Sequence, residues 1–260
     1  MLLPRIVLCS ALLSSASAFA ISNIESQRPG PPPEGWSGQL EFTASGKSGN
    51  VEENRYALGG RLAHKTGDNL VFAIVEAAEA KSLGTKTADD AFVHTRWMHE
   101  QTDRVTFEGF LQWQENAFAN LVSRYLVGGG VRLQLLEEPD VYELAVGIGG
   151  FREWEETDLG TFNRSTDTWR INNYWSYRQS LNDQVNWYAT AYYQPSAEDF
   201  DDYRVLFDTG LTVRLTGSLQ LRVSYNLDHN SHPPRNLDAT PPIDRAETNT
   251  QYATTFLYEF

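Results

Sequence analysis

Apolar and polar residues alternate along several segments of the chain, most clearly near its C-terminus. In 218–228 one set of alternate positions is polar, and the other set is Leu219, Leu221, Val223, Tyr225 and Leu227. Successive side chains of a strand lie on opposite faces, so this segment predicts a strand with one apolar and one polar face. The segments 169–178, 184–194 and 203–215 repeat the pattern. One such segment is a weak signal, and the repetition is what indicates the fold.

Weaker alternation covers the rest of the chain after residue 35. The further candidates are 36–46, 53–65, 69–82, 91–101, 104–115, 123–136, 141–154 and a last strand that ends at Phe260. In 69–82 both sets of alternate positions are apolar, so the pattern leaves open which face is outside. Each segment has the length that a tilted strand needs to cross the hydrocarbon layer. We predict an all-β fold, a transmembrane antiparallel up-and-down β-barrel of about twelve strands.

The connections between these segments provide an independent test. In outer-membrane barrels, short periplasmic turns alternate with longer external loops. If both termini are periplasmic, the short positions hold Thr66-Gly67-Asp68, Gln101-Thr102-Asp103, Glu137-Glu138-Pro139-Asp140, Leu181-Asn182-Asp183 and Thr216-Gly217, all rich in turn formers. The connections 155–166 and 229–243 are much longer. A soluble periplasmic β-protein has no reason to follow this order, so the connections favour the membrane barrel.

The N-terminus has the layout of a secretory signal peptide. Arg5 precedes a short apolar core, and Ala18-Phe19-Ala20 forms a cleavage site of the A-x-A kind. We predict a signal peptide over 1–20, a disordered Pro-rich periplasmic lead-in over 21–35, and an outer-membrane barrel over 36–260. The apolar core is too short to span a bilayer as a helix, and an uncleaved anchor is the alternative. Cys9 is the only cysteine, so we expect no disulfide in the mature protein.

Charge and the C-terminal residues indicate the partners. The formal net charge is −13 at pH 7, and loss of Arg5 with the signal peptide makes it −14, which disfavours nucleic acid. Phe256, Tyr258 and Phe260 alternate at the end of the chain and resemble the assembly signal of outer-membrane barrels. We expect outer-membrane lipids, lipopolysaccharide and the barrel assembly machinery as partners, a location in the cell outer membrane of a Gram-negative bacterium, and no cofactor.

The polar faces of the strands are predicted to line the lumen, and they are rich in charged residues. Eight strands enclose an interior filled by side chains and sixteen or more enclose an aqueous channel, so twelve strands fall between. One interpretation is an interior filled by ion pairs, and the other is a narrow pore whose arginines favour anions. The pore-lining candidates are Arg55, Arg61, Arg124, Arg132, Arg170, Arg178, Arg214 and Arg222, with Glu108, Glu143, Asp208 and also Glu41 opposite them.

The glycines inside the strands do not form phosphate loops, because no helix follows them. They are Gly59, Gly60, Gly128, Gly129, Gly130, Gly147, Gly149 and Gly150. We expect them to relieve crowding inside the barrel or to permit bends. Tryptophans near the strand ends are expected to form interfacial girdles.

Two groups of residues resemble a known family. Gly35-Trp36-Ser37-Gly38 leads a strand that ends in Ser45-Gly46-Lys47-Ser48-Gly49-Asn50, and Ser224-Tyr225-Asn226 and Asn230-Ser231-His232-Pro233-Pro234 precede the final Tyr258-Glu259-Phe260. Over most of residues 35–260 the chain resembles the salt-induced outer membrane protein family, domain of unknown function 481. The insertion-like stretch 237–243 departs from it. The resemblance implies an outer-membrane location, a role in envelope adaptation and no established enzymatic activity, with no catalytic residues to carry over.

Two other groups of residues suggest chemistry. His229 and Ser231 share a strand face, as in outer-membrane lipid hydrolases of the phospholipase or lipid A deacylase type, which are similar in using a His-x-Ser pair. A plain loop is the preferred interpretation, and we predict no enzymatic activity. Acidic residues in two external loops suit calcium or magnesium, but no EF-hand spacing is present, so we predict a solvated acidic rim and no dedicated metal site. These acids are Glu155, Glu156, Asp158, Glu198, Asp199, Asp201 and Asp202.

Overall fold

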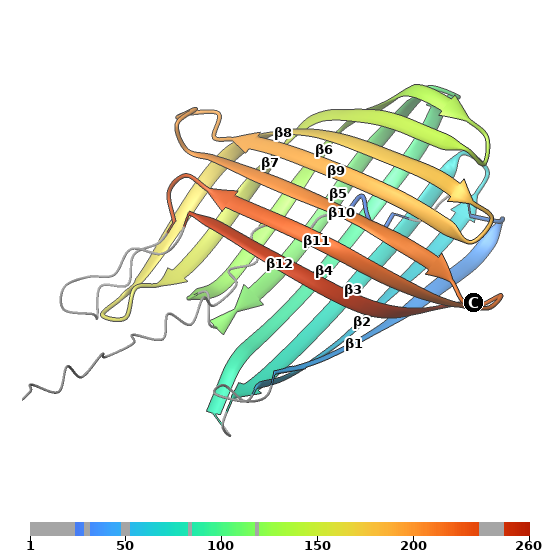
Figure 1. Cartoon of the computed structure of the whole chain (residues 1–260). Helices are drawn as coiled ribbons and strands as arrows, with labels where there is room; N and C mark the ends of the chain where they lie inside the picture. Colours follow the sequence, from blue (N-terminus) through green and yellow to red (C-terminus); the bar gives the residue numbers. More distant parts are fainter. Residues whose placement is uncertain (1–23, 29–31, 48–52, 83–84, 118–119, 234–246) are drawn as a thin grey trace, which may run out of the picture.

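The computed structural model describes residues 24–28, 32–47, 53–82, 85–117, 120–233 and 247–260. Within them, twelve strands form one closed antiparallel barrel in which each strand pairs with its neighbours in sequence and the first pairs with the last (Figure 1). The strands are β1 (Gly35–Lys47), β2 (Glu53–Thr66), β3 (Asn69–Ser82), β4 (Thr85–Thr102), β5 (Val105–Asn116), β6 (Leu121–Glu138), β7 (Tyr142–Asp158), β8 (Asn163–Asn182), β9 (Val185–Pro195), β10 (Tyr203–Arg214), β11 (Leu219–Asn230) and β12 (Thr248–Glu259). The predicted all-β, up-and-down barrel is confirmed. In the described part of the chain, no helix is both long and apolar enough to cross a membrane.

The barrel closes between β1 and β12, and the end of the chain takes part in the closure. The backbone N–H of Gly38 donates to the carbonyl of Phe260 at 2.9 Å, and the N–H of Phe260 donates to the carbonyl of Gly38 at 3.0 Å. The ring of Phe260 lies over Gly38, so closely that a Cβ on that glycine would overlap the ring. The edges of β1 and β12 pair from Gln39 to Phe42 and from Phe256 to Glu259, which protects these edges from pairing with another chain. Phe256, Tyr258 and Phe260 face outward and are at least half exposed, and their role as an assembly signal stays a prediction.

The two faces of the strands differ as the alternation predicts. On the outside, large apolar side chains such as Leu58, Trp175 and Tyr252 are exposed. The structure also settles the facing of β3, where Phe72 and Ile74 are buried inside the barrel and the alternate positions are more exposed. Both faces of β3 are apolar because an apolar cluster lies on the lumen side of this strand. An outer face of this kind is what a barrel presents to lipid.

The predicted short turns each join neighbouring strands, but the connections at the other end of the barrel are not all long: β3 ends at Ser82 and β4 begins at Thr85, and one predicted loop is largely strand. β7 continues to Asp158 and β8 begins at Asn163, so most of the expected loop 155–166 is a hairpin that extends the barrel. Residues 163–167 at the start of β8 are exposed. Because this hairpin is polar on both faces, its ladder hydrogen bonds form without the apolar alternation that marks a strand in the sequence.

Strand glycines let aromatic rings lie flat on the inner wall. Gly147 faces the lumen, and the ring of Tyr174 covers it so closely that a Cβ at this position would overlap the ring. Tyr188 lies over Gly210 in a similar way. The expectation that strand glycines relieve crowding inside the barrel is confirmed at Gly147.

Gly147→Ala should destabilise the barrel, because the new methyl group must push Tyr174 out of a packed interior. Overpacking of this kind costs about 1–3 kcal/mol. The measurement is the urea midpoint at which heat-modifiable gel migration is lost. Gly217→Ala is the matched control, since its Cβ would meet no atom within 4 Å. Equal midpoints for the two variants would contradict this packing.

Candidate functional site

Residues 24–28, the lumen segment, lie inside the barrel, in the half nearer the short turns (Figure 1). The side chain of Ile24 is 2% exposed and packs into an apolar cluster of the inner wall. That cluster consists of Ala63, Leu70, Phe72, Ile74, Phe92 and Met98. Full burial of such a side chain contributes about 1.5–3 kcal/mol. Disorder was expected over 21–35, whereas residues 24–28 are fixed in the lumen; the predicted signal peptide 1–20 lies outside the described residues.

Glu25 is the centre of the contacts between the lumen segment and the wall. Its side chain is fully buried, and its two carboxylate oxygens accept hydrogen bonds from Arg96 Nη1 at 2.6 Å and Arg132 Nη1 at 2.5 Å. Burial alone would raise the pKa of Glu25, but the Arg132 and Arg96 guanidiniums outweigh it and lower this pKa to about 2. Glu25 is therefore charged at neutral pH. Breaking a buried pair of this kind typically costs about 3–5 kcal/mol, because the remaining charge is uncompensated.

Further wall residues bind the backbone of the lumen segment. Arg61 Nη1 donates to the carbonyl of Gln27 at 2.6 Å. Arg178 Nη2 donates to the carbonyls of Glu25 and Arg28 at 2.7 and 2.8 Å. The Gln27 side chain donates to Glu76. With Arg96 and Arg132, arginines of four strands, β2, β4, β6 and β8, hold the segment.

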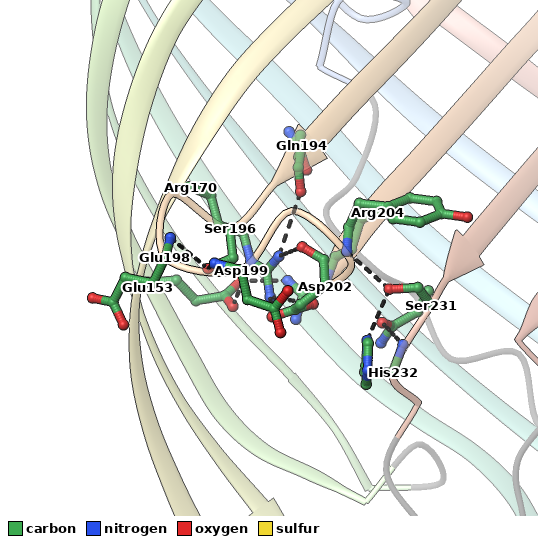
Figure 2. A network of polar contacts seen from close by, with 12 residues as sticks. Glu153, Arg170, Gln194, Ser196, Glu198, Asp199, Asp202, Arg204, Ser231 and His232 are labelled. Atoms are coloured by element: carbon green, nitrogen blue, oxygen red, sulfur yellow. Dashed lines mark hydrogen bonds and ion pairs between the residues drawn. The ribbon is translucent and has the colours of Figure 1, made fainter.

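A second group of buried charges, the Glu153 cluster, fills the lumen near the long loops along β6 to β10. Glu153 is 1% exposed, and its carboxylate binds Arg170 Nε at 3.2 Å, Arg204 Nη1 and, at 3.6 Å, Arg124 Nε. Figure 2 shows Arg170 reaching from Glu153 to Asp202 in the β9–β10 connection, with both Asp202 oxygens at 3.1 and 2.9 Å from Arg170 Nη2. The wall therefore carries both members of these pairs, and this side of the lumen is filled by its own side chains.

Glu155 extends the Glu153 cluster toward the loops. It binds Arg124 Nη2 at 2.6 Å and Arg204 Nη2 at 3.0 Å. It therefore points into the barrel, and the prediction that it lies on a solvated external loop is wrong. Among the residues that the structure describes, no group of three or more His, Cys, Asp or Glu could hold a metal ion.

A cavity of about 240 Å³ lies on the loop side of the lumen segment, along β1 to β5 and β9 to β12. Ser26 and Gln27 line it together with wall residues. Its charged lining is mainly acidic and comprises Glu41, Glu76, Asp90, Glu115, Asp208 and Asp228, with Arg222 as the one cation among the described lining residues. The lumen therefore has two regions of opposite charge preference. The acidic wall of the cavity favours cations, whereas the arginines around Glu25 bind a carboxylate.

Most of the predicted pore-lining residues fall into these groups. Arg61, Arg132 and Arg178 bind the lumen segment, and Arg124 and Arg170 belong to the Glu153 cluster. The predicted acids lie near cations or phenols: Glu108 accepts from Tyr174 at 2.8 Å, Glu143 is 3.5 Å from Arg178, Asp208 accepts from Tyr188 at 3.1 Å and Glu41 is 3.6 Å from Arg222.

Of the remaining candidates, one lies away from the lumen contacts, and the side chain of another is not among the described residues. Arg214 is exposed at the end of β10, at the rim of the barrel. The backbone of Arg55 pairs in β2, and its side chain lies outside the described residues. The residues that the sequence reasoning missed are Glu25, Arg96, Glu153 and Arg204. The last three occupy lumen-facing alternate positions and were open to detection, whereas no periodic pattern includes Glu25.

His229 and Ser231 do not form a catalytic pair in this structure. The Nδ1 atom of His229 hydrogen-bonds the Thr248 hydroxyl at 2.9 Å. The Ser231 hydroxyl lies 2.8 Å from the carbonyl of Asp201, to which it donates, and 3.0 Å from Nδ1 of His232 (Figure 2). These contacts tie Ser231 to the β9–β10 connection, as expected for a structural loop.

Comparisons with known proteins agree with the fold. The family model described as protein of unknown function, DUF481, matches residues 40–260. No curated protein matches the sequence.

Solved structures of outer-membrane barrels resemble the chain. One is the COG4313 outer membrane channel from Pseudomonas putida F1, with a TM-score of 0.55, 12% identity, and coverage of 90% of this chain and 99% of that one. Another is the translocator domain of autotransporter NalP from Neisseria meningitidis, with a TM-score of 0.54, 11% identity, and coverage of 87% and 88%. A third is the NanC porin, with a TM-score of 0.51, 10% identity, and coverage of 86% and 100%. At such identities the likeness shows the barrel fold alone.

Proposed function

Because the chain belongs to the DUF481 family of proteins of unknown function, and because it folds as a closed barrel, we propose that it is an integral β-barrel protein of the bacterial outer membrane that forms a narrow pore, closed by its own lumen segment. The observation that carries the proposal is the buried Glu25 carboxylate between Arg96 and Arg132. This closing element belongs to no strand, so it can leave while every strand pair of the barrel stays intact. The apolar outer face supports the location in a membrane.

The lumen differs between its two halves, and this difference favours a closed pore as the interpretation, in preference to a permanently filled interior. In the Glu153 cluster, both partners of each ion pair belong to strands of the barrel wall, so the cluster cannot be displaced without unfolding strands. The lumen segment is held by side-chain contacts, and the 240 Å³ cavity adjoins it on the loop side. Removal of the segment would therefore extend this cavity toward the short turns.

The proposed role is non-enzymatic. The contacts of Ser231 with the β9–β10 connection support this, because its hydroxyl is not poised by His229. We propose outer-membrane lipids, lipopolysaccharide and the barrel assembly machinery as the partners of the protein. A role in envelope adaptation, such as adaptation to salt, rests on the family resemblance of the sequence and stays a prediction.

Single-channel recording in a planar bilayer tests the pore. We expect the purified full chain to give a mostly closed barrel with brief conductance steps, because the segment is docked by the six hydrogen bonds named above, which must open together. Heat-modifiable gel migration of the same sample verifies that the barrel is folded. If neither the wild type nor variants changed at Glu25 conduct, the pore hypothesis is excluded and a structural barrel remains.

Acidification should leave the pore closed until far below neutral pH. The pKa of Glu25 is lowered from 4.5 to about 2 on docking, so the ion pairs stabilise the docked segment fully above the undocked value and lose this effect as the pH falls toward the docked one. We expect a low open probability from about pH 8 to about pH 4 and a rise below about pH 3. In Glu25→Gln this acid-dependent rise should be missing. A wild-type pore that opens near pH 6 would contradict the pairing.

A further inference from the structure

The wall around Ile24 and Glu25 is organised to bind a carboxylate. Arg96 and Arg132 are 3% and 2% exposed, and both point at one anion that the strands do not supply. The wall carboxylates near them are less closely placed, since Glu108 is 3.7 Å from Arg96, whereas Glu25 is 2.6 Å from it. Without Glu25, the two guanidiniums would be buried with an incomplete set of partners, which is unfavourable.

An apolar pocket adjoins these arginines. The residue before Glu25 is Ile24, and its side chain fills the cluster around Phe72 and Ile74. The site therefore receives a four-carbon aliphatic group and a carboxylate from adjacent residues. These are also the two parts of a short-chain amphiphilic acid.

We infer that the site occupied by Ile24 and Glu25 is a binding site for small monocarboxylates with a short apolar group, and that such a solute competes with the lumen segment for it. The inference rests on the proposed closing of the lumen by this segment, and it does not depend on conduction. The lumen segment belongs to the same chain as the site that it occupies, so its effective concentration at the site is high. A solute must therefore be abundant to displace it. Because acids line the cavity on the loop side, we expect the solute to reach the arginines from the side of the short turns.

Calorimetric titration of the full chain in detergent with 4-methylpentanoate tests the inference. Glu25→Gln should bind this probe roughly ten-fold or more tightly than the wild type, because its internal competitor has no charge. The matched alcohol, 4-methylpentan-1-ol, should bind to neither protein. Arg132→Gln added to Glu25→Gln should abolish binding, and Arg104→Gln, which removes an exposed arginine, should not.

Three outcomes would overturn the inference: equal affinities of Glu25→Gln and wild type, binding of the alcohol as tight as that of the acid, or binding that survives Arg132→Gln.

If Glu25→Gln does not show heat-modifiable migration, labelling replaces titration. Ser26→Cys in the mature chain carries the only thiol, since Cys9 lies in the predicted signal peptide. The probe should then accelerate maleimide labelling at this position, and no acceleration would count against the site. Carboxylate binding without conductance removes the pore alone, and conductance without carboxylate binding removes this inference alone.

Discussion

Glu25→Arg is expected to convert a mostly closed barrel into an open pore. The substitution removes both ion pairs of Glu25 and places another guanidinium beside Arg96 and Arg132, which are buried and now repel it. Loss of one partner of a buried pair costs about 3–5 kcal/mol. Since each 1.4 kcal/mol is a factor of ten, the ratio of docked to undocked segment should fall by roughly two to three and a half orders of magnitude. The measurement is the open probability in single-channel recordings.

The matched control for Glu25→Arg is Glu34→Arg. Glu34 is exposed and lies in the same N-terminal part of the chain, so this variant has the same change in net charge without entering the lumen. It should conduct like the wild type. Both variants should keep heat-modifiable gel migration, because neither residue belongs to a strand. An open probability that is the same in Glu25→Arg and Glu34→Arg would show that the lumen segment does not close the barrel.

The barrel was predictable because the alternation of apolar and polar side chains appears within each single strand. A strand that separates lipid from lumen must alternate every second residue, so 203–215 and 218–228 show their facing in the sequence itself. The β7–β8 hairpin beyond Glu155 was not predicted, because strands in water need no apolar face. The facing of β3 was also undetermined, since the lumen beside Phe72 is apolar where a polar face is the usual pattern.

The candidate site was only partly predictable, for a different reason. Arg132 and Arg178 follow the alternation and were placed in the lumen correctly. Their partner Glu25 lies 107 and 153 positions away from them, in a segment whose prolines and glycines indicate a lead-in outside the sheet. What fixes this segment is the match between one carboxylate, one aliphatic side chain and a wall assembled from several strands. No single stretch of the sequence contains that match.

Glu153→Gln should destabilise the barrel without opening it. The neutral amide would leave Arg170, Arg204 and Arg124 with less negative charge in a buried cluster, where Glu153 is 1% exposed. We expect a loss of about 3–5 kcal/mol in the free energy of unfolding. The measurement is the urea midpoint of heat-modifiable gel migration. Because buried pairs are poorly screened, the loss should be nearly the same at low and at high salt.

Glu138→Gln is the control for this variant, since it removes one carboxylate at an exposed position near a short turn. Its midpoint should match that of the wild type, and a midpoint as low as that of Glu153→Gln would mean that net charge, not the buried cluster, sets stability.

Glu153→Gln and Glu25→Arg also test each other. The wall cluster should control unfolding and leave the open probability low, whereas Glu25 should control the open probability and leave unfolding nearly unchanged. If both substitutions changed both properties together, the lumen segment would be part of the folded core and not a separable closing element.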